Sequence, residues 1–224
     1  MTWVKICGVT NLEDAQAAVA AGVDALGFVF YDKSPRNIDW QLAGKIVAQI
    51  PERVEKVGVF VNDSVERIDQ YVHHAGLTVV QLCGKESVVA FIKHLRSQRD
   101  KDHRPKVISV IPSGTLPEHE LFVDKDLRTA LHALLIDSAS DAEPGGTGKH
   151  FDWKKSKEVV ETLGLTIPTI VAGGLTAKNV GEALAVLHPW GVDVASGVEA
   201  KPGKKDPEKI RAFVSAVRKA ERLA

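Results

Sequence analysis

Short apolar runs alternate with amphipathic stretches from one end of the chain to the other. Runs that are apolar on both faces are typical of parallel strands covered by helices. The predicted strands are Trp3–Cys7, Ala25–Phe30, Lys56–Val61, Thr78–Leu82, Lys106–Ile111, Ala133–Asp137, Thr169–Ala172 and Val192–Ala195. The predicted helices are Leu12–Ala21, Trp40–Gln49, Ser64–His73, Ser87–Arg96, Trp153–Leu163, Ala177–Leu187 and Pro207–Leu223, with the weakest pattern at Glu118–Thr129.

Capping residues support several of these helices. Asn11, Asp39, Asp63 or Ser64, and Asp206 stand where an N-terminal cap is needed. Gly22 and Gly76 follow helices at positions that favour a left-handed C-terminal cap.

Repeated strand–helix units in 224 residues predict an α/β fold, a (β/α)8 TIM barrel, whose typical size is roughly 250 residues. The alternative is a doubly wound open sheet, which usually has fewer strands and a glycine-rich first turn that this chain lacks. No segment has the composition of a linker, so we expect one domain over residues 1–224. The long irregular stretch Ser138–Asp152 is interpreted as an active-site loop.

Composition excludes several classes of protein. Twenty-nine basic residues balance 29 acidic ones, which argues against a nucleic-acid or membrane partner. Two cysteines give no disulfide framework, and no leader is recognised, so the cytoplasm is expected. We interpret His73, His74 and His103 as solvated side chains rather than metal ligands. A monomer is expected, with a homodimer as the alternative.

Polar residues gather where the predicted strands end, which in a barrel is the catalytic rim. Each residue has an ordinary explanation when taken alone, but the predicted strands all contribute to the same rim. These residues are Cys7, Arg36, Asn62, Gln81, Cys83, Ser113, Asp137, Gly173, Gly174, Ser196 and Gly197.

Lys5 and Cys7 share one face of the first strand because strand side chains alternate in direction. An ammonium group beside a thiol favours the thiolate, so we expect Lys5 to lower the pKa of Cys7. A small buried cysteine beside an extended lysine fits the pattern equally well. Asp193 lies on the last strand, next to the first in a closed barrel, and is predicted to pair with Lys5. A purely structural ion pair is at least as compatible with the sequence.

Glycines follow both of the last two strands, at Gly173-Gly174 and Gly197. Glycine allows backbone N–H groups to approach an anion closely, and barrels often bind phosphate at these two strand ends. We therefore predict a phosphate-bearing substrate.

The motifs of the chain closely resemble those of phosphoribosylanthranilate isomerases of tryptophan biosynthesis. The resemblance extends from Val4 to about Arg218. It rests on Lys5-Ile6-Cys7-Gly8, Gly27-Phe28-Val29-Phe30, Ser34-Pro35-Arg36, Val80-Gln81-Leu82, Gly145-Gly146-Thr147-Gly148, Phe151-Asp152-Trp153, Ala172-Gly173-Gly174-Leu175, Asn179-Val180, Val192-Asp193-Val194 and Ser196-Gly197-Val198-Glu199.

The resemblance implies a cofactor-free Amadori rearrangement of N-(5-phosphoribosyl)anthranilate. Asp137 would be the general acid, Cys7 the general base, and Arg36 the ligand of the anthranilate carboxylate. The substrate-binding set would be Lys5, Arg36, Gln81, Gly146, Gly173, Gly174, Ser196 and Gly197. The chain departs from the family at Cys83, where a histidine is usual, so no role is carried over to that residue.

Three alternatives remain open. The histidine-pathway isomerase of the same fold carries aspartates at the ends of strands one and five and shows two similar half-barrels, neither of which is seen here. A barrel that binds phosphosugars without catalysis is disfavoured by Cys7 and Asp137. Service as a free-standing partner of indole-glycerol-phosphate synthase gains no support from the sequence.

Overall fold

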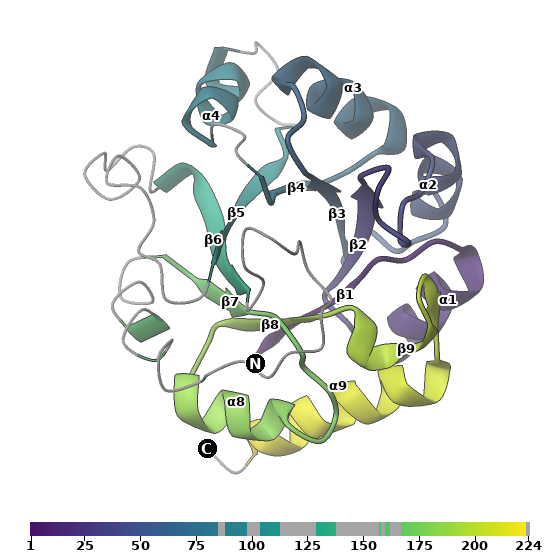
Figure 1. The fold of residues 1–224 in the computed structure, drawn as a ribbon, viewed down its shortest axis with the longest axis vertical. Coiled ribbons are helices and arrows are strands. Elements are labelled where there is room, and N and C mark those ends of the chain that lie inside the picture. Colours follow the sequence, from purple (N-terminus) through teal and green to yellow (C-terminus); the bar gives the residue numbers. More distant parts are fainter. Residues whose placement is uncertain are drawn as a thin grey trace.

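Eight parallel strands close into a barrel in which each strand pairs with the next along the chain and β8 pairs with β1 (Figure 1). The computed structural model describes residues 1–84, 88–97, 104–112, 129–137, 157, 160–161 and 167–222. The barrel strands are β1 (Trp3–Cys7), β2 (Ala25–Phe30), β3 (Glu55–Phe60), β4 (Val79–Leu82), β5 (Lys106–Pro112), β6 (Leu131–Asp137), β7 (Thr169–Val171) and β8 (Gly191–Val194). The predicted (β/α)8 barrel is confirmed.

The described helices surround the barrel (Figure 1). They are α1 (Leu12–Ala20), α2 (Trp40–Val47), α3 (Val65–Ala75), α4 (Val88–Ser97), α8 (Val180–Leu187) and α9 (Pro207–Glu221), with a 3-10 turn, η1 (Ser196–Val198). The side chains of Asn11, Asp39, Ser64 and Asp206 accept hydrogen bonds from the first turns of α1, α2, α3 and α9, as their positions predict. Gly76 ends α3 in the left-handed conformation (φ 66°).

Two apolar clusters result from the alternation of strand side chains. One fills the space between the barrel and its helices and includes Ile6, Leu26 and Phe28. The other fills the inside of the barrel and consists largely of small and branched residues, Ala25, Val57, Val59, Val79, Ile108, Ala133, Leu135 and Ile170. The barrel is therefore a packed core, and chemistry must occur at an end of it.

The amino ends of the strands carry a polar cluster of their own. Glu55 at the start of β3 accepts a hydrogen bond from Lys106 of β5 at 2.5 Å and lies 3.7 Å from Nε2 of His132 on β6. His132 contacts the edge of Trp190, which stacks on Trp3 at 5.3 Å. These contacts join both halves of the barrel at the end opposite the strand carboxyl ends.

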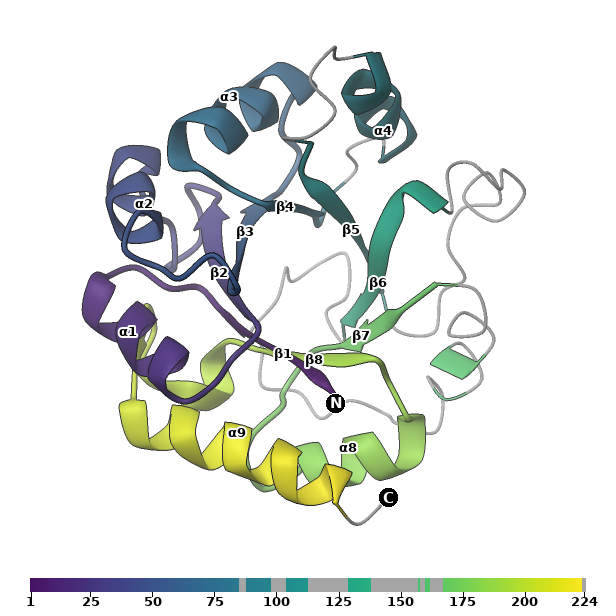
Figure 2. The ribbon, with the colours of Figure 1, turned by 180° about the vertical axis from the view of Figure 1, so that it is seen from behind.

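A short hairpin follows β8 and was not predicted. It consists of β9 (Glu199–Lys201) and β10 (Lys204–Lys205), two antiparallel strands in a stretch of charged residues before α9. The hairpin lies beside α1 because Lys204 pairs with Glu13 and Asp14. Figure 2 shows α8, α9 and α1 side by side around the β8–β1 part of the barrel.

Most predicted boundaries agree with the observed ones to within a few residues. The predictions at Glu118–Thr129, Trp153–Leu163 and Ser138–Asp152 fall largely or wholly outside the described residues. Of the first two segments, only Thr129, Lys157, Val160 and Glu161 are described, and all are helical.

Candidate active site

Cys7 is the last residue of β1, and its side chain lies on the interior face of the barrel with that of Lys5. Lys5 stands opposite Asp193 in the β1–β8 register, and its Nζ lies 3.0 Å from Oδ2 of Asp193. The predicted ion pair is therefore confirmed. The Lys5 side chain has no exposed surface, so the pair sits inside the barrel beneath the thiol.

Burial and neighbouring charges of both signs set the pKa values of Lys5 and Cys7. Burial alone would lower the pKa of Lys5, but Asp193 and Cys7 outweigh it and raise that pKa. Burial also raises the pKa of the Cys7 thiol, while the charges of Lys5 and Lys205 act to lower it. Lys5 thus acts on the Cys7 thiol in the expected direction, but the net pKa is raised, because removal of the thiolate from water outweighs the nearby cations.

Space for the thiol comes from a glycine on the neighbouring strand. Gly27 pairs with Cys7 in the β1–β2 register, and a Cβ atom at Gly27 would lie 2.8 Å from the Cys7 sulfur and 3.0 Å from Cε of Lys5. A side chain at this position would displace both groups. Gly27 stands in a motif of the sequence, but its role is visible only once the strands are paired.

Gln81 lies on β4 and Cys83 directly follows this strand, across the barrel from Cys7 on β1. Nε2 of Gln81 donates a hydrogen bond to the Cys83 sulfur at 3.3 Å. Burial raises the pKa of the Cys83 thiol to about 12, and the charge of Asp137 contributes in the same direction. Both cysteines are free, as expected for thiols on opposite sides of the barrel.

Asp137 ends β6, as predicted, and stands opposite Pro112 of β5. Strand side chains alternate in direction, so Asp137 is on the same face of β6 as Ala133 and Leu135, which belong to the apolar cluster inside the barrel. Cys7 and Asp137 thus approach the same opening from strands well separated around the ring (Figure 1).

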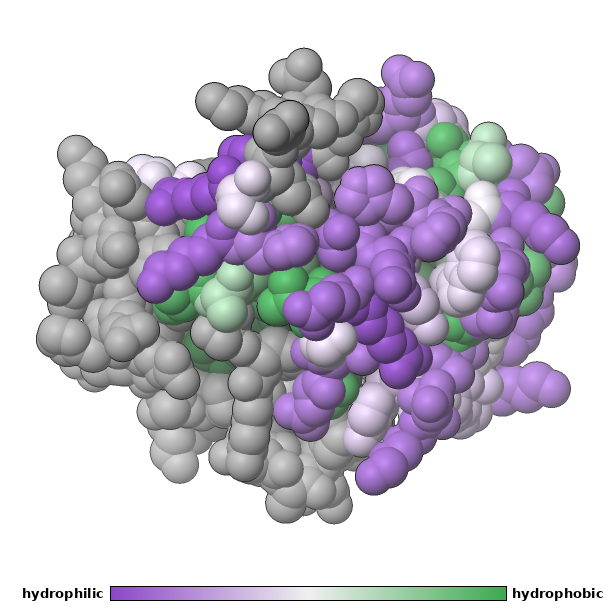
Figure 3. Space-filling view, turned by 90° about the horizontal axis from the view of Figure 1, so that it is seen from above, coloured by the Kyte–Doolittle hydropathy of each residue, from purple (hydrophilic) through white to green (hydrophobic). Residues whose placement is uncertain are grey.

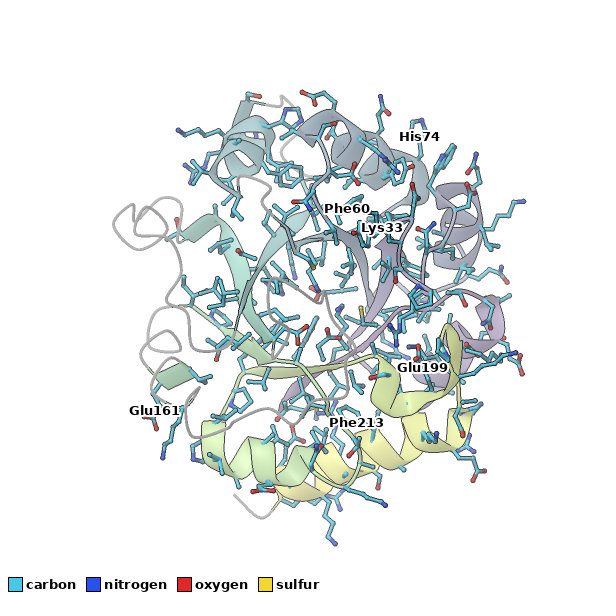
Figure 4. The ribbon with its side chains drawn as sticks, viewed as in Figure 1. Lys33, Phe60, His74, Glu161, Glu199 and Phe213 are labelled. Atoms are coloured by element: carbon cyan, nitrogen blue, oxygen red, sulfur yellow. The ribbon has the colours of Figure 1, made fainter. Side chains whose placement is uncertain are left out.

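Arg36, in the loop after β2, is held by the hairpin. Its Nε and Nη2 donate hydrogen bonds of 2.8 Å to the two carboxylate oxygens of Glu199. Nζ of Lys205 lies 2.9 Å from Oε1 of the same carboxylate. Figure 4 shows Glu199 beside the barrel opening, inside the ring of helices. The sequence did not single out Glu199 as a partner of Arg36.

Arg36 lies close to the end of β1. A Cβ atom at Gly8, the residue after Cys7, would lie 2.5 Å from Cδ of Arg36. Gly8 has a φ of 75°, a conformation that glycine adopts readily. The arginine stem therefore packs directly over the backbone next to the thiol.

The glycines after β7 and β8 form the adjacent part of the rim. Gly173 and Gly174 have φ values of 90° and 64°. Among the described residues, neither backbone N–H has a hydrogen-bond partner. A Cβ atom at Gly197 would collide with the backbone oxygen of Leu175, so the segments after the two strands are packed against each other. Ser196 begins η1 beside them.

Some predicted site residues lie outside the described part of the chain. These are Gly146, Ser113 and the loop Ser138–Asp152. Within the described residues, no group of three or more His, Cys, Asp or Glu side chains is placed to hold a metal ion.

The geometry defines a class of protein. A closed (β/α)8 barrel that presents a thiol, a carboxylate and an oriented arginine at the carboxyl ends of its strands is an enzyme of the TIM-barrel type. The family model described as N-(5'phosphoribosyl)anthranilate (PRA) isomerase matches residues 4–216. The chain therefore belongs to this family. It is an isomerase of tryptophan biosynthesis that converts an aldose to a ketose.

Individual relatives agree along nearly the whole chain. The N-(5'-phosphoribosyl)anthranilate isomerase of Chlorobaculum tepidum is 40% identical over 222 residues, which cover 99% of this chain and 97% of the relative. The crystal structure of the Thermotoga maritima enzyme aligns with a TM-score of 0.81 at 36% identity, covering 98% of this chain and all of the other. A further structure of such an enzyme, in complex with reduced 1-(o-carboxyphenylamino)-1-deoxyribulose 5-phosphate, aligns with a TM-score of 0.77 at 35% identity over 98% of this chain and all of the other.

The described surface is mostly hydrophilic in the view of Figure 3, with small apolar areas between polar side chains. Of the large apolar side chains that the structure describes, only Met1 and Leu42 are strongly exposed. No described helix is long and apolar enough to span a bilayer.

Proposed function

We propose that this enzyme catalyses the Amadori rearrangement of N-(5-phosphoribosyl)anthranilate to 1-(2-carboxyphenylamino)-1-deoxyribulose 5-phosphate, with Asp137 as general acid and Cys7 as general base. The observation that carries the proposal is the convergence of these two groups on one opening. Arg36 lies beside Cys7, and the glycines after β7 and β8 complete the rim. We further propose that residues 1–224 form one catalytic domain.

The first step requires an acid. Asp137 donates a proton to the furanose ring oxygen, the C1′–O bond breaks, and the nitrogen lone pair forms a Schiff base at C1′. The carboxyl must hold its proton near neutral pH to act as this acid. The proton transferred to the ring oxygen remains on the hydroxyl group that ring opening creates.

The second step requires a base. Cys7, as the thiolate, removes the proton from C2′, and the electron pair of that bond moves to form the enolamine. Tautomerisation to the ketone then gives the product. A buried thiolate is a stronger base than an exposed one because burial raises its pKa. The charges of Lys5 and Lys205 act in the opposite direction and stabilise the thiolate.

The remaining predicted site residues would bind the substrate. Arg36 suits the anthranilate carboxylate, since a planar guanidinium can donate two parallel hydrogen bonds. The backbone N–H groups at Gly173, Gly174 and Gly197, with Ser196, suit the phosphate. Gln81 lines the wall, and Gly146 is assigned by resemblance alone. We propose for Lys5 a role in positioning and charging Cys7, since its ammonium is buried beneath the thiol.

The chemistry bears on the setting of the enzyme. A thiol base must stay reduced, so a reducing compartment such as the cytoplasm suits this protein. The proposed partner is a small-molecule phosphosugar. One structural neighbour consists of monomers generated from the dimeric phosphoribosylanthranilate isomerase of Thermotoga maritima. For this chain we propose a monomer, with a homodimer as the alternative.

The experiment follows the loss of anthranilate-type fluorescence after freshly prepared phosphoribosylanthranilate is added. We expect turnover by the parent and a rate lower by about 100-fold or more in Cys7→Ser and in Asp137→Asn, since general acid–base groups commonly contribute that much. Cys83→Ser, which changes the other thiol, is the control and should remain within a few-fold of the parent. Turnover that survives Asp137→Asn would reassign the acid, and a parent without turnover would refute the proposed reaction.

A further inference from the structure

Arg36, Glu199 and Lys205 form a buried charge cluster at the edge of the site. We propose that Glu199 and Lys205 are positioning residues that set the specificity of the enzyme for the substrate carboxylate, acting through Arg36. This inference rests on the proposed function, in which Arg36 binds the carboxylate of the anthranilate ring. Three features of the cluster support it: the orientation of the guanidinium, the charge balance and the attachment of the hairpin.

Glu199 fixes the orientation of the guanidinium. Its two carboxylate oxygens accept hydrogen bonds from Nε and Nη2 of Arg36, so Glu199 binds the side of the guanidinium that includes Nε. A guanidinium has five N–H donors in one plane, and this arrangement leaves three of them, including both on Nη1, for another acceptor. Among the described residues, Nη1 makes no hydrogen bond and no ion pair. The stem of Arg36 rests on Gly8, the residue that follows Cys7.

Lys205 keeps the cluster positive. Glu199 alone would cancel the charge of Arg36 and weaken its attraction for an anion. Lys205 adds a second cation, with Nζ 2.9 Å from Glu199 Oε1 and 3.1 Å from the backbone oxygen of Ala195. The three groups then carry a formal charge of +1, which matches one carboxylate. The side chains of Lys205 and Glu199 are 0% and 5% exposed, so solvent screens this charge weakly.

The hairpin holds the cluster on the barrel. The backbone N–H of Lys205 donates to Asp14 of α1, and the hydroxyl of Thr10 donates to the backbone oxygen of Gly203. Gly203 itself donates to Glu199 and packs against the backbone oxygen of Pro35. The hairpin therefore connects the loop that carries Arg36 with the segment that follows Cys7.

A purely structural ion cluster would make a different prediction. Loss of such a cluster would lower stability and weaken every ligand of the site to a similar extent. Loss of a positioning residue for Arg36 would weaken ligands that carry the ring carboxylate and spare those without it. The test must therefore compare two ligands that differ in this group alone.

The probes are reduced 1-(o-carboxyphenylamino)-1-deoxyribulose 5-phosphate and its counterpart without the ring carboxylate. Calorimetry gives the Kd of each for the parent and for Glu199→Asp, which keeps the charge of the cluster but shortens the side chain that orients Arg36. We expect the preference of the parent for the carboxylate to fall about tenfold in Glu199→Asp, the scale of one charge-assisted hydrogen bond. The Kd of the ligand without the carboxylate should change by less than about twofold. In an Arg36→Met background, Glu199→Asp should leave the preference unchanged.

Glu13→Asp is the matched control, because Glu13 pairs with the same hairpin through Lys204 but makes no contact with Arg36. The preference of this control variant for the carboxylate should equal that of the parent. Should Glu199→Asp fail to fold, Lys205→Met provides a second comparison, and its preference should also fall because the cluster becomes neutral. An unchanged preference, or equal weakening of both ligands, would overturn the inference. Turnover by the parent tests the proposed function separately, so the two failures are distinguishable.

Discussion

The ion pair of Lys5 and Asp193 shows how much one pair of residues can control at this site. Two charges inside a barrel cost free energy unless each compensates the other. Here the pair lies directly beneath Cys7, where the ammonium lowers and the carboxylate raises the pKa of the thiol. The effect of this ion pair on the free energy of unfolding and its effect on the pKa of Cys7 can be separated by changing one partner or both.

Lys5→Met should destabilise the protein by about 3–5 kcal/mol, because it leaves the Asp193 carboxylate buried without a partner. The double variant Lys5→Met/Asp193→Leu should recover most of this loss, since neither charge then remains. Urea unfolding of the two variants and the parent measures the effect. Equal losses in the single and double variants would contradict this account.

The same variants make a prediction about Cys7. Removal of the Lys5 cation should raise the pKa of the Cys7 thiol further. Removal of both charges should raise it less, because the loss of the Asp193 carboxylate lowers the pKa again, by a smaller amount. The pH dependence of alkylation by iodoacetamide reports the thiolate, in a Cys83→Ala background that eliminates the second thiol. If alkylation of the Lys5→Met variant follows the pH profile of the parent, Lys5 does not affect the pKa of Cys7.

At the scale of elements, backbone contacts at strand ends hold the rim together. The segments after β7 and β8 meet where Gly197 packs against the backbone oxygen of Leu175, and there is no room for a side chain between them. Such a contact ties two neighbouring segments of the rim to one another. It cannot be relieved by a change of rotamer, because the obstructing atom belongs to the backbone.

Gly197→Ala should therefore reduce the free energy of unfolding by about 3 kcal/mol or more, the upper end of the cost of overpacking. Gly181→Ala is the matched control. Gly181 lies in the first turn of α8, where a Cβ atom would make only an ordinary contact with Cβ of Ala220 at 3.9 Å. That variant should be stabilised by up to about 1 kcal/mol. A small loss in Gly197→Ala, comparable with other surface substitutions, would show that the two segments can separate.

The elements that could be predicted from the sequence are those set by local rules. Periodicity and caps place β1, β2 and α1 almost to the residue, and the partner of Lys5 follows from closure of the barrel. The hairpin of β9 and β10 could not be predicted, because its charged residues resemble a solvated loop. Lys205 is buried only because Glu199, Ala195 and Asp14 surround it in three dimensions. The raised pKa of Cys7 depends likewise on burial, which strand spacing does not report.

At the scale of the whole molecule, the two ends of the barrel carry different polar groups. The carboxyl ends hold Cys7, Arg36 and Asp137, whereas the amino ends hold the cluster of Glu55, Lys106 and His132. Burial alone would raise the pKa of Glu55, but His132 and Lys106 outweigh it and lower that pKa to about 2. A carboxylate whose pKa is lower in the folded protein than in the unfolded chain stabilises the fold only while it is ionised.

The stability of the barrel should therefore depend on pH through Glu55. Its contribution is complete above the ordinary pKa of 4.5 and is lost as the pH falls toward about 2, where the folded protein also takes up the proton. The half-exposed Lys106 is screened by water, so the contribution should be on the order of 1 kcal/mol. In urea unfolding, the stability difference between the parent and Glu55→Gln should shrink by about this amount between about pH 6 and about pH 3. Glu208→Gln removes an exposed pair with Arg211 on α9 and should keep the pH dependence of the parent. If Glu55→Gln instead loses stability with falling pH as steeply as the parent does, the acid sensitivity of the fold arises elsewhere, and the cluster at the amino ends contributes to packing alone.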